Sequence, residues 1–502
     1  MDYVAYITSR QVQNGYTSLP FPIFADTMDY QKTARFTADI WDSTIVPTLK
    51  DYIEIPAKSP VFDSDWQVNG YIDAAVVLMM DWCKKHPIAD ATCEVIQLDG
   101  RTPTIFMEVP GTLDRNLLLY GHLDKQPEMT GWREGMGPWI PVVQGDKLYG
   151  RGGADDGYAL FASVAAILAL KEQGLPHANL KVLIEASEES GSPDLPAYMD
   201  ALEARIGQPD VVICLDSGCG NYEQMWLTTS LRGMVTGTLS VDVLTEGVHS
   251  GDAGGVVPSS FRILRQLLER VEDADSGTIR LAEFHQEIPE VRKQQAQLAA
   301  EVMGVDAFNR FPFAEDTRAT GADVADMILN RTWCPCLEVT GAEGLPAIDN
   351  AGNVLRPITS AKLSLRLPPE VDASLAEAAL TATLESDPPY NAQVRFLNGH
   401  SASGWHAPLT VAWLEQAINR ASHAFFGKPS VNMGEGGSIP FMAMLGDRDP
   451  DAQFVITGVL GPKSNAHGPN EFLHIPMGKK LTSCVASIIH DHYAFHTGED
   501  HH

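Results

Sequence analysis

Short apolar runs alternate with helical patterns over about the first 230 residues of the chain. A short run that is apolar in its middle and closed by glycine or charged residues is typical of a buried strand. Apolar residues that recur at spacings of about four are typical of a helix with one buried face. The expected strands are 104–109, 116–120, 180–186 and 211–215, and the expected helices are 29–53, 73–85 and 158–171.

The order of these elements predicts the fold class. Strands that alternate with helices form βαβ units, so we expect an α/β fold with a mixed, mostly parallel sheet flanked by helices. The strand 116–120 is expected to stop at Gly121. The helix 29–53 is expected to kink or break at Pro47, because proline disrupts a helix interior.

The pattern changes after about residue 229 and returns at about residue 406. Between them we expect strands at 237–243, 361–367 and 393–397, helices at 258–271 and 373–385, and helices and loops over 274–332. Afterwards we expect a helix at 408–425, a strand at 454–457 and a helix at 477–493. The sequence therefore predicts two parts of one domain, 1–230 and 399–502, with an α+β domain, 231–398, inserted between them.

Length, charge and cysteines narrow the classes of function. At 502 residues the chain exceeds one ordinary core, so two or three domains are expected. The formal net charge of −29 argues against a nucleic-acid partner and against an anionic membrane surface. The 7 scattered cysteines do not indicate a disulfide framework. With no secretory signal pattern at the N-terminus and no apolar run long enough to span a membrane, we expect a soluble, cytoplasmic protein.

Metal-ligand side chains follow the ends of the expected strands. Each group alone has a structural explanation, since a histidine is often held by a carboxylate, a Glu-Glu pair is often solvated, and Asp-Gly often forms a turn. Together they indicate a cation, because buried carboxylates at neighbouring strand ends would otherwise repel one another. This combination of histidine and carboxylates suits zinc or a similar divalent ion. The groups are His122 with Asp124, Asp155 with Asp156, Glu188 with Glu189, and Asp216.

These motifs, with a fifth near the C-terminus, resemble the M20 family of metallopeptidases. That family includes carnosinase-type dipeptidases, glutamate carboxypeptidases, and acylornithine and succinyl-diaminopimelate deacylases. The resemblance extends over most of the chain, in order. The motifs are Gly-His-Leu-Asp at 121–124, Tyr-Gly-Arg-Gly at 149–152 with Asp-Asp at 155–156, Glu-Glu-Ser-Gly at 188–191, Asp-Ser at 216–217, and His-Gly-Pro-Asn-Glu at 467–471.

The resemblance implies a site for two divalent metal ions, with zinc expected and manganese or cobalt as alternatives. In that site His122 and Asp216 hold one ion, Glu189 and His467 hold the other, and Asp155 bridges the two. It also implies a zinc-peptidase-like catalytic domain, in which the inserted domain serves as a lid and for dimerisation.

The resemblance also implies two supporting roles and one backbone feature. Asp124 would orient the ring of His122, as carboxylates commonly do for metal-bound histidines. Glu188 would be the general base that activates a metal-bound water. The peptide bond between Asp155 and Asp156 is expected to be cis.

Three further places resemble the family's substrate-binding parts, each with a simpler alternative. His249, in Glu-Gly-Val-His-Ser-Gly at 246–251, is similar to a lid histidine that is lent to the other subunit, which implies a homodimer; alone it would be a surface histidine. Arg366 suits a substrate carboxylate, but could form a surface ion pair. Residues 435–438 are similar to a carnosinase-type substrate segment, but could form an ordinary turn. They are Glu435, Gly436, Gly437 and Ser438.

Two departures from the family pattern concern the substrate pocket. Residues 301–332 have no counterpart that we can place, and Gly157 follows Asp156 where Lys-Gly is more usual. The 5 histidines of the C-terminal stretch 490–502 are interpreted as a solvated end rather than as a metal site.

The expected function is hydrolysis of a peptide or amide bond in a small substrate with a free carboxylate. A dipeptidase or exopeptidase is the leading hypothesis. An N-acyl-amino-acid deacylase with the same metal centre is the alternative within this class. From a different class, an inactive metal-binding interaction protein remains an alternative, although every expected ligand and Glu188 are present.

Overall fold

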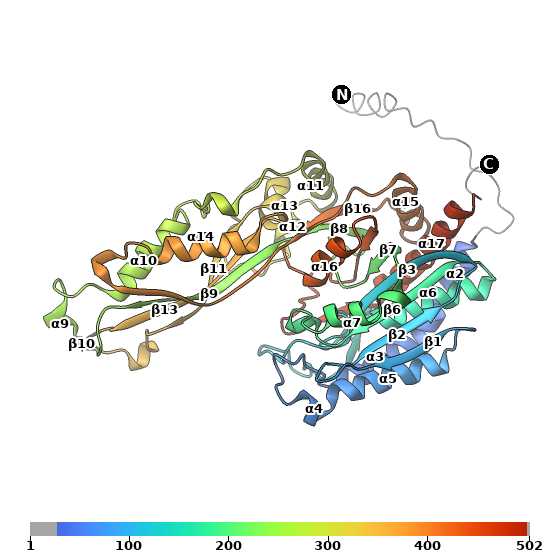
Figure 1. Cartoon of the computed structure of the whole chain (residues 1–502), viewed down its shortest axis with the longest axis horizontal. Helices are drawn as coiled ribbons and strands as arrows, with labels where there is room; N and C mark the ends of the chain where they lie inside the picture. Colours follow the sequence, from blue (N-terminus) through green and yellow to red (C-terminus); the bar gives the residue numbers. More distant parts are fainter. Residues whose placement is uncertain (1–27, 499–502) are drawn as a thin grey trace, which may run out of the picture.

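The computed structural model describes residues 28–498, which form two lobes (Figure 1). The main lobe contains the larger sheet and both ends of the described chain, and the elongated lobe extends to one side of it. No helix within 28–498 is long and apolar enough to cross a membrane.

A six-stranded mixed sheet is the centre of the main lobe, with strand order β1-β2-β6-β3-β7-β17. Strands β6, β3, β7 and β17 run parallel to one another, whereas β1 and β2 pair antiparallel at one edge. This is the α/β fold with a mostly parallel sheet that the sequence predicts. The strands are β1 Thr92–Ile96, β2 Thr104–Val109, β3 Leu113–His122, β6 Ala178–Glu185, β7 Pro209–Cys214 and β17 Gln453–Ile456.

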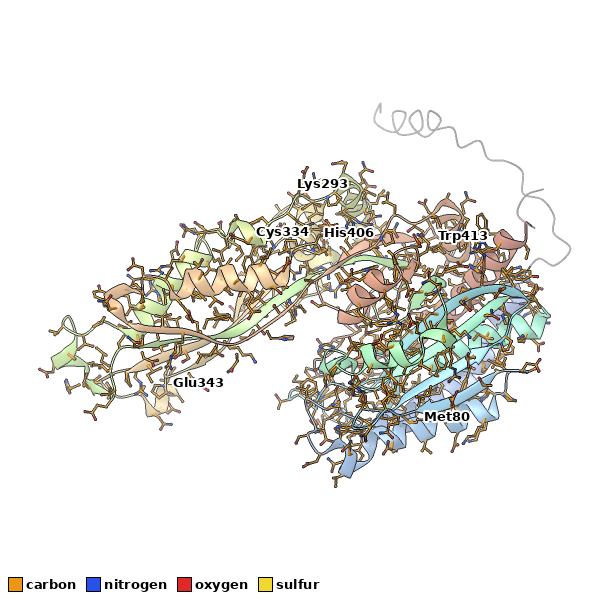
Figure 2. All side chains as sticks on the ribbon, in the orientation of Figure 1. Met80, Lys293, Cys334, Glu343, His406 and Trp413 are labelled. Atoms are coloured by element: carbon orange, nitrogen blue, oxygen red, sulfur yellow. The ribbon has the colours of Figure 1, made fainter. Side chains whose placement is uncertain are left out.

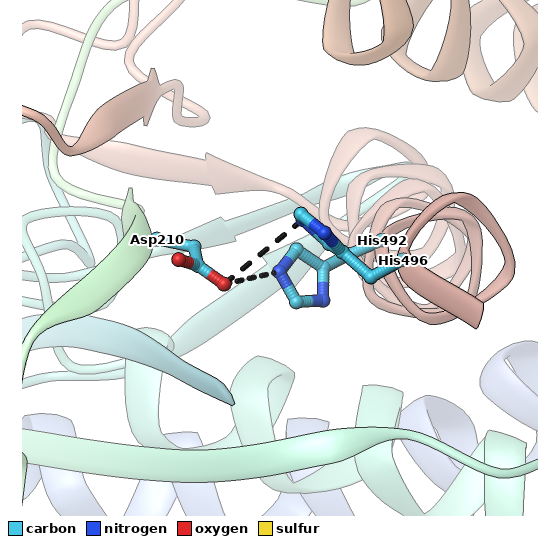
Figure 3. Close-up of side chains that lie close together, drawn as sticks. All are labelled: Asp210, His492 and His496. Atoms are coloured by element: carbon cyan, nitrogen blue, oxygen red, sulfur yellow. Dashed lines mark hydrogen bonds and ion pairs between the residues drawn. The ribbon is translucent and has the colours of Figure 1, made fainter. Parts of the chain in front are cut away.

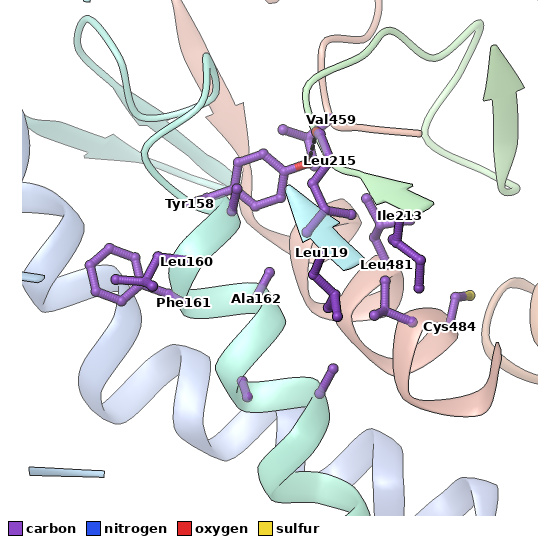
Figure 4. Close-up of a cluster of buried hydrophobic side chains, with 14 of the residues drawn as sticks. Leu119, Tyr158, Leu160, Phe161, Ala162, Ile213, Leu215, Val459, Leu481 and Cys484 are labelled. Atoms are coloured by element: carbon purple, nitrogen blue, oxygen red, sulfur yellow. Dashed lines mark hydrogen bonds between the residues drawn. The ribbon is translucent and has the colours of Figure 1, made fainter. Parts of the chain in front are cut away.

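Helices pack on this sheet, and α6 is central among them. It is apolar on almost every face and buried along most of its length, as expected of a helix enclosed by other elements. Side chains of α6 and α17 meet Leu119 of β3 and Ile213 of β7 in one hydrophobic core (Figure 4). The helices of this lobe are α2 Tyr30–Ile40, α3 Val46–Glu54, α4 Trp66–Asn69, α5 Tyr71–Lys85, α6 Ala159–Gln173, α7 Leu195–Ala201, α8 Glu203–Ile206, α15 Ala412–Phe426, α16 Pro440–Arg448 and α17 Ile475–Thr497.

Two smaller three-stranded sheets complete the main lobe, in the orders β15-β8-β16 and β18-β5-β4. In the first, β8 pairs parallel with β16 although about two hundred residues separate them. In the second, β18 brings the chain after His467 beside the glycine turn that follows β5. The strands are β4 Val142–Gln144, β5 Lys147–Tyr149, β8 Trp226–Leu231, β15 Trp405–His406, β16 Val431–Glu435 and β18 Phe472–His474.

The elongated lobe is built on an antiparallel sheet of order β11-β13-β9-β14. Helices α10 and α14 cover this sheet and share a hydrophobic core with it that is separate from the main-lobe core. A short pair, β10 and β12, lies at the far end together with α9 (Figure 1). The elements are β9 Gly233–Asp242, β10 Val248–His249, α9 Ser250–Ala253, α10 Ser260–Val271, β11 Cys336–Glu343, β12 Val354–Leu355, β13 Ile358–Leu367, α14 Ala373–Glu385 and β14 Gln393–Ala402.

Three helices between these lobes belong by packing to the main-lobe core. They are α11 Glu290–Met303, α12 Asp306–Asn309 and α13 Val324–Trp333. Buried alanines of α11 and Ile328 of α13 join that core, and α11 packs against β16. At the junction, the side chain of Arg292 in α11 donates to His406 Nε2 in β15 at 3.0 Å; Figure 2 labels His406 there. The segment that sequence reasoning could not place therefore packs beside the main lobe.

One of the expected boundaries is met in part and another is wrong. The helix continues past Pro47 without a break, but a π-helical stretch, Trp41–Ile45, interrupts its α-helical pattern directly before that residue and widens the turn where proline lacks an N–H. Strand β3 does not stop at Gly121 but continues to His122. Glycine is needed there for close packing, since a Cβ would lie 2.4 Å from the Ala159 Cβ and 2.7 Å from Asp156 Oδ2.

Candidate metal centre

The candidate ligands meet at the carboxyl ends of three adjacent parallel strands. In the order β6-β3-β7, all three strands end at the same edge of the sheet. His122 is the last residue of β3, Glu188 and Glu189 begin a short 3-10 turn after β6, and Asp216 follows β7. This edge is where open α/β sheets bind their ligands.

Asp155 lies between two histidines that come from distant parts of the chain. Its Oδ1 is 3.4 Å from His122 Nε2, and its Oδ2 is 3.0 Å from His467 Nε2. Asp216 Oδ2 lies 3.7 Å from His122 Nε2, and Glu189 Oε2 lies 3.5 Å from His467 Nε2. Ligands of one tetrahedral ion lie about 3.3–3.5 Å apart, so these distances are compatible with two ligand groups that share Asp155. Ligand atoms of His122, Asp155 and Glu189, and those of His122, Asp156 and Asp216, also lie close enough together to hold an ion.

Buried polar atoms without hydrogen-bond partners at this edge of the sheet are suited to bind cations. The Nε2 atom of His122 and the Oε1 atom of Glu189 are buried, with no hydrogen-bond partner among the described residues. Buried polar atoms without a partner are uncommon in folded proteins, and His122 Nε2 lies 3.4–3.9 Å from carboxylate oxygens of Asp155, Asp216 and Glu188. The donor set of imidazole nitrogens and carboxylate oxygens suits zinc, manganese or cobalt.

The electrostatics of the cluster also favour a cation. Burial, with the neighbouring carboxylate of Asp216, raises the pKa of Glu188 well above its usual value. Burial likewise raises the pKa of Glu189, with a contribution from Asp155, and raises the pKa of Asp216 to about 6. Burial opposes ionisation of Asp155 too, but His122 and His467 outweigh it and lower its pKa. A divalent ion would favour the ionised form of every carboxylate in the group.

Asp124 holds the backbone around the centre more directly than it holds the ring of His122. Its two carboxylate oxygens accept hydrogen bonds from the backbone N–H groups of Glu188 and Glu189, at 3.1 and 3.0 Å. The Nδ1 atom of His122 lies 3.1 Å from the backbone carbonyl oxygen of Asp124 and 3.5 Å from its carboxylate. Asp124 therefore positions both the turn with the two glutamates and the imidazole.

A buried ion pair fastens the loop that carries His467. Arg151 Nη1 pairs with a carboxylate oxygen of Glu471, and Arg151 Nη2 donates to the carbonyl oxygen of Gly468 at 2.9 Å. The other oxygen of Glu471 accepts from the backbone N–H of Gly152 at 2.9 Å. Both residues stand inside the motifs quoted above, but sequence reasoning assigned neither of them a role.

The glycine turn that carries Asp155 is tightly filled. The Asp155–Asp156 peptide is cis, as the resemblance implies. Gly157 is in contact with Tyr52, whose ring atom Cε1 would lie 2.1 Å from a Cβ at that position. Nearby, the buried amine of Lys125 donates to the backbone carbonyl of Tyr52 at 2.6 Å. A lysine could not follow Asp156 without displacing this tyrosine, which accounts for one departure from the family pattern.

A pocket of about 400 Å³ opens onto the candidate centre. Glu188 faces this pocket, and its carboxylate accepts no hydrogen bond from the described residues. Two cationic side chains, Arg310 and Lys463, line the same pocket, and Phe311 adds an apolar wall. Arg310 has no carboxylate within ion-pair distance among residues 28–498, and burial lowers its pKa. Sequence reasoning missed Arg310 because its segment matched no motif.

The expected substrate-binding residues lie partly at this pocket. Glu435, Gly437 and Ser438 line it, but Gly436 and Arg366 do not. Arg366 Nη1 donates to Ser438 Oγ at 3.3 Å and therefore supports the segment from behind. Glu435 is paired with Arg331 at 3.2 Å.

His249 is not brought to this pocket within one chain. It ends β10 and precedes α9, at the far end of the elongated lobe (Figure 1). Its side chain accepts from the backbone N–H of Gly251 at 3.1 Å.

Comparison with known proteins identifies the family. The model of peptidase family M20/M25/M40 matches residues 118–491. The chain belongs to this family. It is similar to the cysteinylglycine-S-conjugate dipeptidase of Corynebacterium striatum, with 27% identity over 404 residues that cover 77% of this chain and 81% of the relative. It is also similar to the Beta-Ala-His dipeptidase of Homo sapiens, with 26% identity over 343 residues and 65% of each chain covered.

The fold agrees with this membership. The solved structure of the dipeptidase Dug1p from Saccharomyces cerevisiae matches with a TM-score of 0.74 and 22% identity, over 92% of this chain and 99% of the other. As a member of the M20/M25/M40 family, the chain is a metal-dependent hydrolase of peptide bonds.

Proposed function

We propose that this chain is a dinuclear metal dipeptidase with His122, Asp155, Glu189, Asp216 and His467 as ligands. The observation that carries the proposal is the position of the Asp155 carboxylate, one oxygen toward each histidine. The similar proteins from Corynebacterium striatum and Homo sapiens are both named as dipeptidases, which supports the substrate class.

Glu188 is the proposed general base. Two divalent ions held by these ligands would lower the pKa of a water molecule and polarise the scissile carbonyl. Glu188 projects into the pocket beside the ligands, so it can take a proton from the attacking water. The oxygen of this water then forms a bond with the carbonyl carbon of the substrate, while Glu188 holds the proton. When the C–N bond breaks, the same carboxyl group gives the proton to the leaving amine.

Zinc is the ion that we propose, with manganese or cobalt as alternatives. Two imidazoles and three carboxylates form a mixed nitrogen and oxygen set, which all three ions accept. The contacts of His467 Nε2 with Asp155 at 3.0 Å and with Glu189 at 3.5 Å are compatible with a zinc ion between these ligands.

The pocket supports a small substrate with a free carboxylate. Its volume of about 400 Å³ suits a short peptide. Arg310 offers a guanidinium without a carboxylate partner among residues 28–498, in a pocket that also contains Lys463 and the anionic metal ligands. Since guanidinium pairs well with carboxylate, we assign the C-terminal carboxylate of the substrate to Arg310. Arg366, the residue expected from the sequence, then acts by holding Ser438 in place.

A homodimer formed through the elongated lobe is part of the proposal. His249 lies far from the pocket of its own chain, at an end of the elongated lobe where it could reach a second subunit. A cytoplasmic location is also proposed, and the 7 cysteines, all of them free, support it.

A substrate panel tests the proposed function. Dipeptides such as Cys-Gly and β-Ala-His are assayed with zinc, manganese or cobalt, beside their C-terminal amides and a series of N-acetyl amino acids. We expect turnover of free dipeptides, with a higher KM for the amides because they lack the carboxylate. Activity on the N-acetyl series alone would establish the deacylase alternative instead, and metal binding without hydrolysis of any substrate would favour an inactive interaction protein.

A further inference from the structure

A second group of metal-ligand side chains lies at the other end of strand β7. Asp210 is the second residue of β7, whereas Asp216 follows the end of that strand. At about 3.3 Å per residue, the two aspartates are about 20 Å apart. His492 and His496, one helical turn apart near the end of α17, face Asp210 (Figure 3).

The carboxylate of Asp210 divides its two oxygens between different partners. Oδ1 accepts a hydrogen bond from Arg115 Nη1 at 2.8 Å. Oδ2 lies 3.0 Å from His492 Nε2 and 4.0 Å from His496 Nε2. Arg115 therefore fixes the carboxylate and leaves Oδ2 to the two imidazoles.

A hydrogen bond explains only one of these two imidazole contacts. The contact of 3.0 Å is a normal hydrogen bond, but 4.0 Å is too long for one. The imidazole of His496 makes no side-chain hydrogen bond to any residue within 28–498. Ligands of one tetrahedral zinc ion lie about 3.3–3.5 Å apart, so both contacts are within about 0.7 Å of the separation that a shared ion requires.

The surroundings orient both rings and leave a path to solvent. His492 is fully buried, and Trp413 packs edge-on against it and against His496, at centroid distances of 5.7 and 6.0 Å. The Nδ1 atom of His492 is buried without a hydrogen-bond partner in the described chain, so the ring is oriented through Nε2. Asp210 and His496 line a pocket of about 250 Å³, together with Asp449 and Asp451, which add negative charge.

We propose that Asp210, His492 and His496 bind one additional divalent ion of the zinc type. One carboxylate oxygen and two neutral imidazole nitrogens are a common ligand set for zinc, with water in the fourth position. Histidines four residues apart project from the same face of a helix, so α17 presents both to β7. The ion would fasten the last helix to the central sheet, on the side away from the catalytic centre. The interpretation of the histidines at 490–502 as a solvated end is wrong for His490 and His492, which are both buried.

Zinc content per chain tests this site. The whole protein and its His496→Ala variant are equilibrated with micromolar free zinc, and bound zinc is measured by mass spectrometry. We expect the variant to bind about one ion fewer than the wild type. We also expect zinc to raise the melting temperature of the wild type more than that of the variant. Because the readout is a difference, it does not depend on the number of ions in the catalytic centre.

Two controls make the result specific. His423→Ala removes an exposed histidine of α15, and the double variant His501→Ala, His502→Ala removes histidines at the C-terminus. Both should keep the additional ion. If His496→Ala fails to fold, His496→Gln preserves side-chain size without the imidazole and should show the same loss. Equal zinc content in the wild type and the folded His496 variant, or loss of the ion in the double C-terminal variant, would overturn the proposal.

Discussion

At the scale of single residues, Asp155 joins the two halves of the candidate centre. Its oxygens lie 3.4 Å from His122 Nε2 and 3.0 Å from His467 Nε2, although these histidines are far apart in the sequence. A carboxylate in this position can hold two ions about 3.5–4 Å apart, the separation at which both act on one water and one substrate. An asparagine side chain has the same length, but it offers only one oxygen and no negative charge.

Replacing Asp124 and replacing His122 should have different effects on metal binding. Asp124→Asn retains one acceptor for the N–H groups of Glu188 and Glu189, but its amide NH₂ cannot accept the second bond. We expect about a 10–100-fold loss of zinc affinity with stoichiometry retained at saturating zinc. His122→Ala should lose one ion even at saturation. Zinc titration with metal analysis measures both, and complete loss of metal in both variants would show that Asp124 has another role.

At the scale of elements, the buried pair of Arg151 and Glu471 connects the glycine turn to the loop of His467. Glu471→Gln should leave the Arg151 guanidinium buried without a counter-charge and lower the free energy of unfolding by about 3–5 kcal/mol. Urea unfolding measures this. The matched control is Glu269→Gln, which breaks an exposed pair with Arg280 and should cost less than about 1 kcal/mol. Similar losses in the two variants would mean that the buried pair does not stabilise the loop.

The sequence was sufficient for five of the six strands of the main sheet, which are short, mostly apolar runs, but it missed the edge strand β1, Thr92–Ile96, whose residues are largely exposed. It was insufficient where an element depends on a distant partner. Strand β8, Trp226–Leu231, contains polar residues and forms by pairing with β16 about two hundred residues later. Arg310 reaches the pocket only because α11 and α13 pack on the main lobe, and no local pattern encodes that packing. Gly121 was mistaken for a strand end because its close contact with Ala159 of α6 cannot be read from the sequence.

At the scale of the whole molecule, metal removal should destabilise the protein most at neutral pH. Without metal, burial raises the pKa of Asp216 to about 6, above its value in an unfolded chain. Such a group contributes stability when protonated, and this contribution is lost as pH rises through about 6. The metal-free protein should therefore gain stability between pH 7.5 and 5.5, whereas metal binding weakens as protons compete for the carboxylates.

Thermal unfolding with and without a chelator checks this expectation. The difference in melting temperature between the metal-loaded and metal-free protein should be large at pH 7.5 and smaller at pH 5.5. A difference that grows on acidification would contradict the account of the carboxylate cluster.

The proposed dimer gives a separate test of His249. A heterodimer of Glu188→Gln and His249→Ala subunits would contain one intact site, formed by Glu188 of one subunit and His249 of the other. Random pairing of equal amounts should therefore restore about a quarter of wild-type activity from two nearly inactive variants. Activity that remains at the sum of the separate variants after subunit exchange would exclude a shared site.

The most direct test of the central claim is the kcat of Glu188→Gln on a dipeptide at full metal occupancy. Glutamine has the size of glutamate but cannot accept the proton of the attacking water. The account predicts that the variant binds the same amount of metal as the wild type and that kcat falls by about 10²–10⁴-fold. Unchanged turnover at equal metal content would contradict the account.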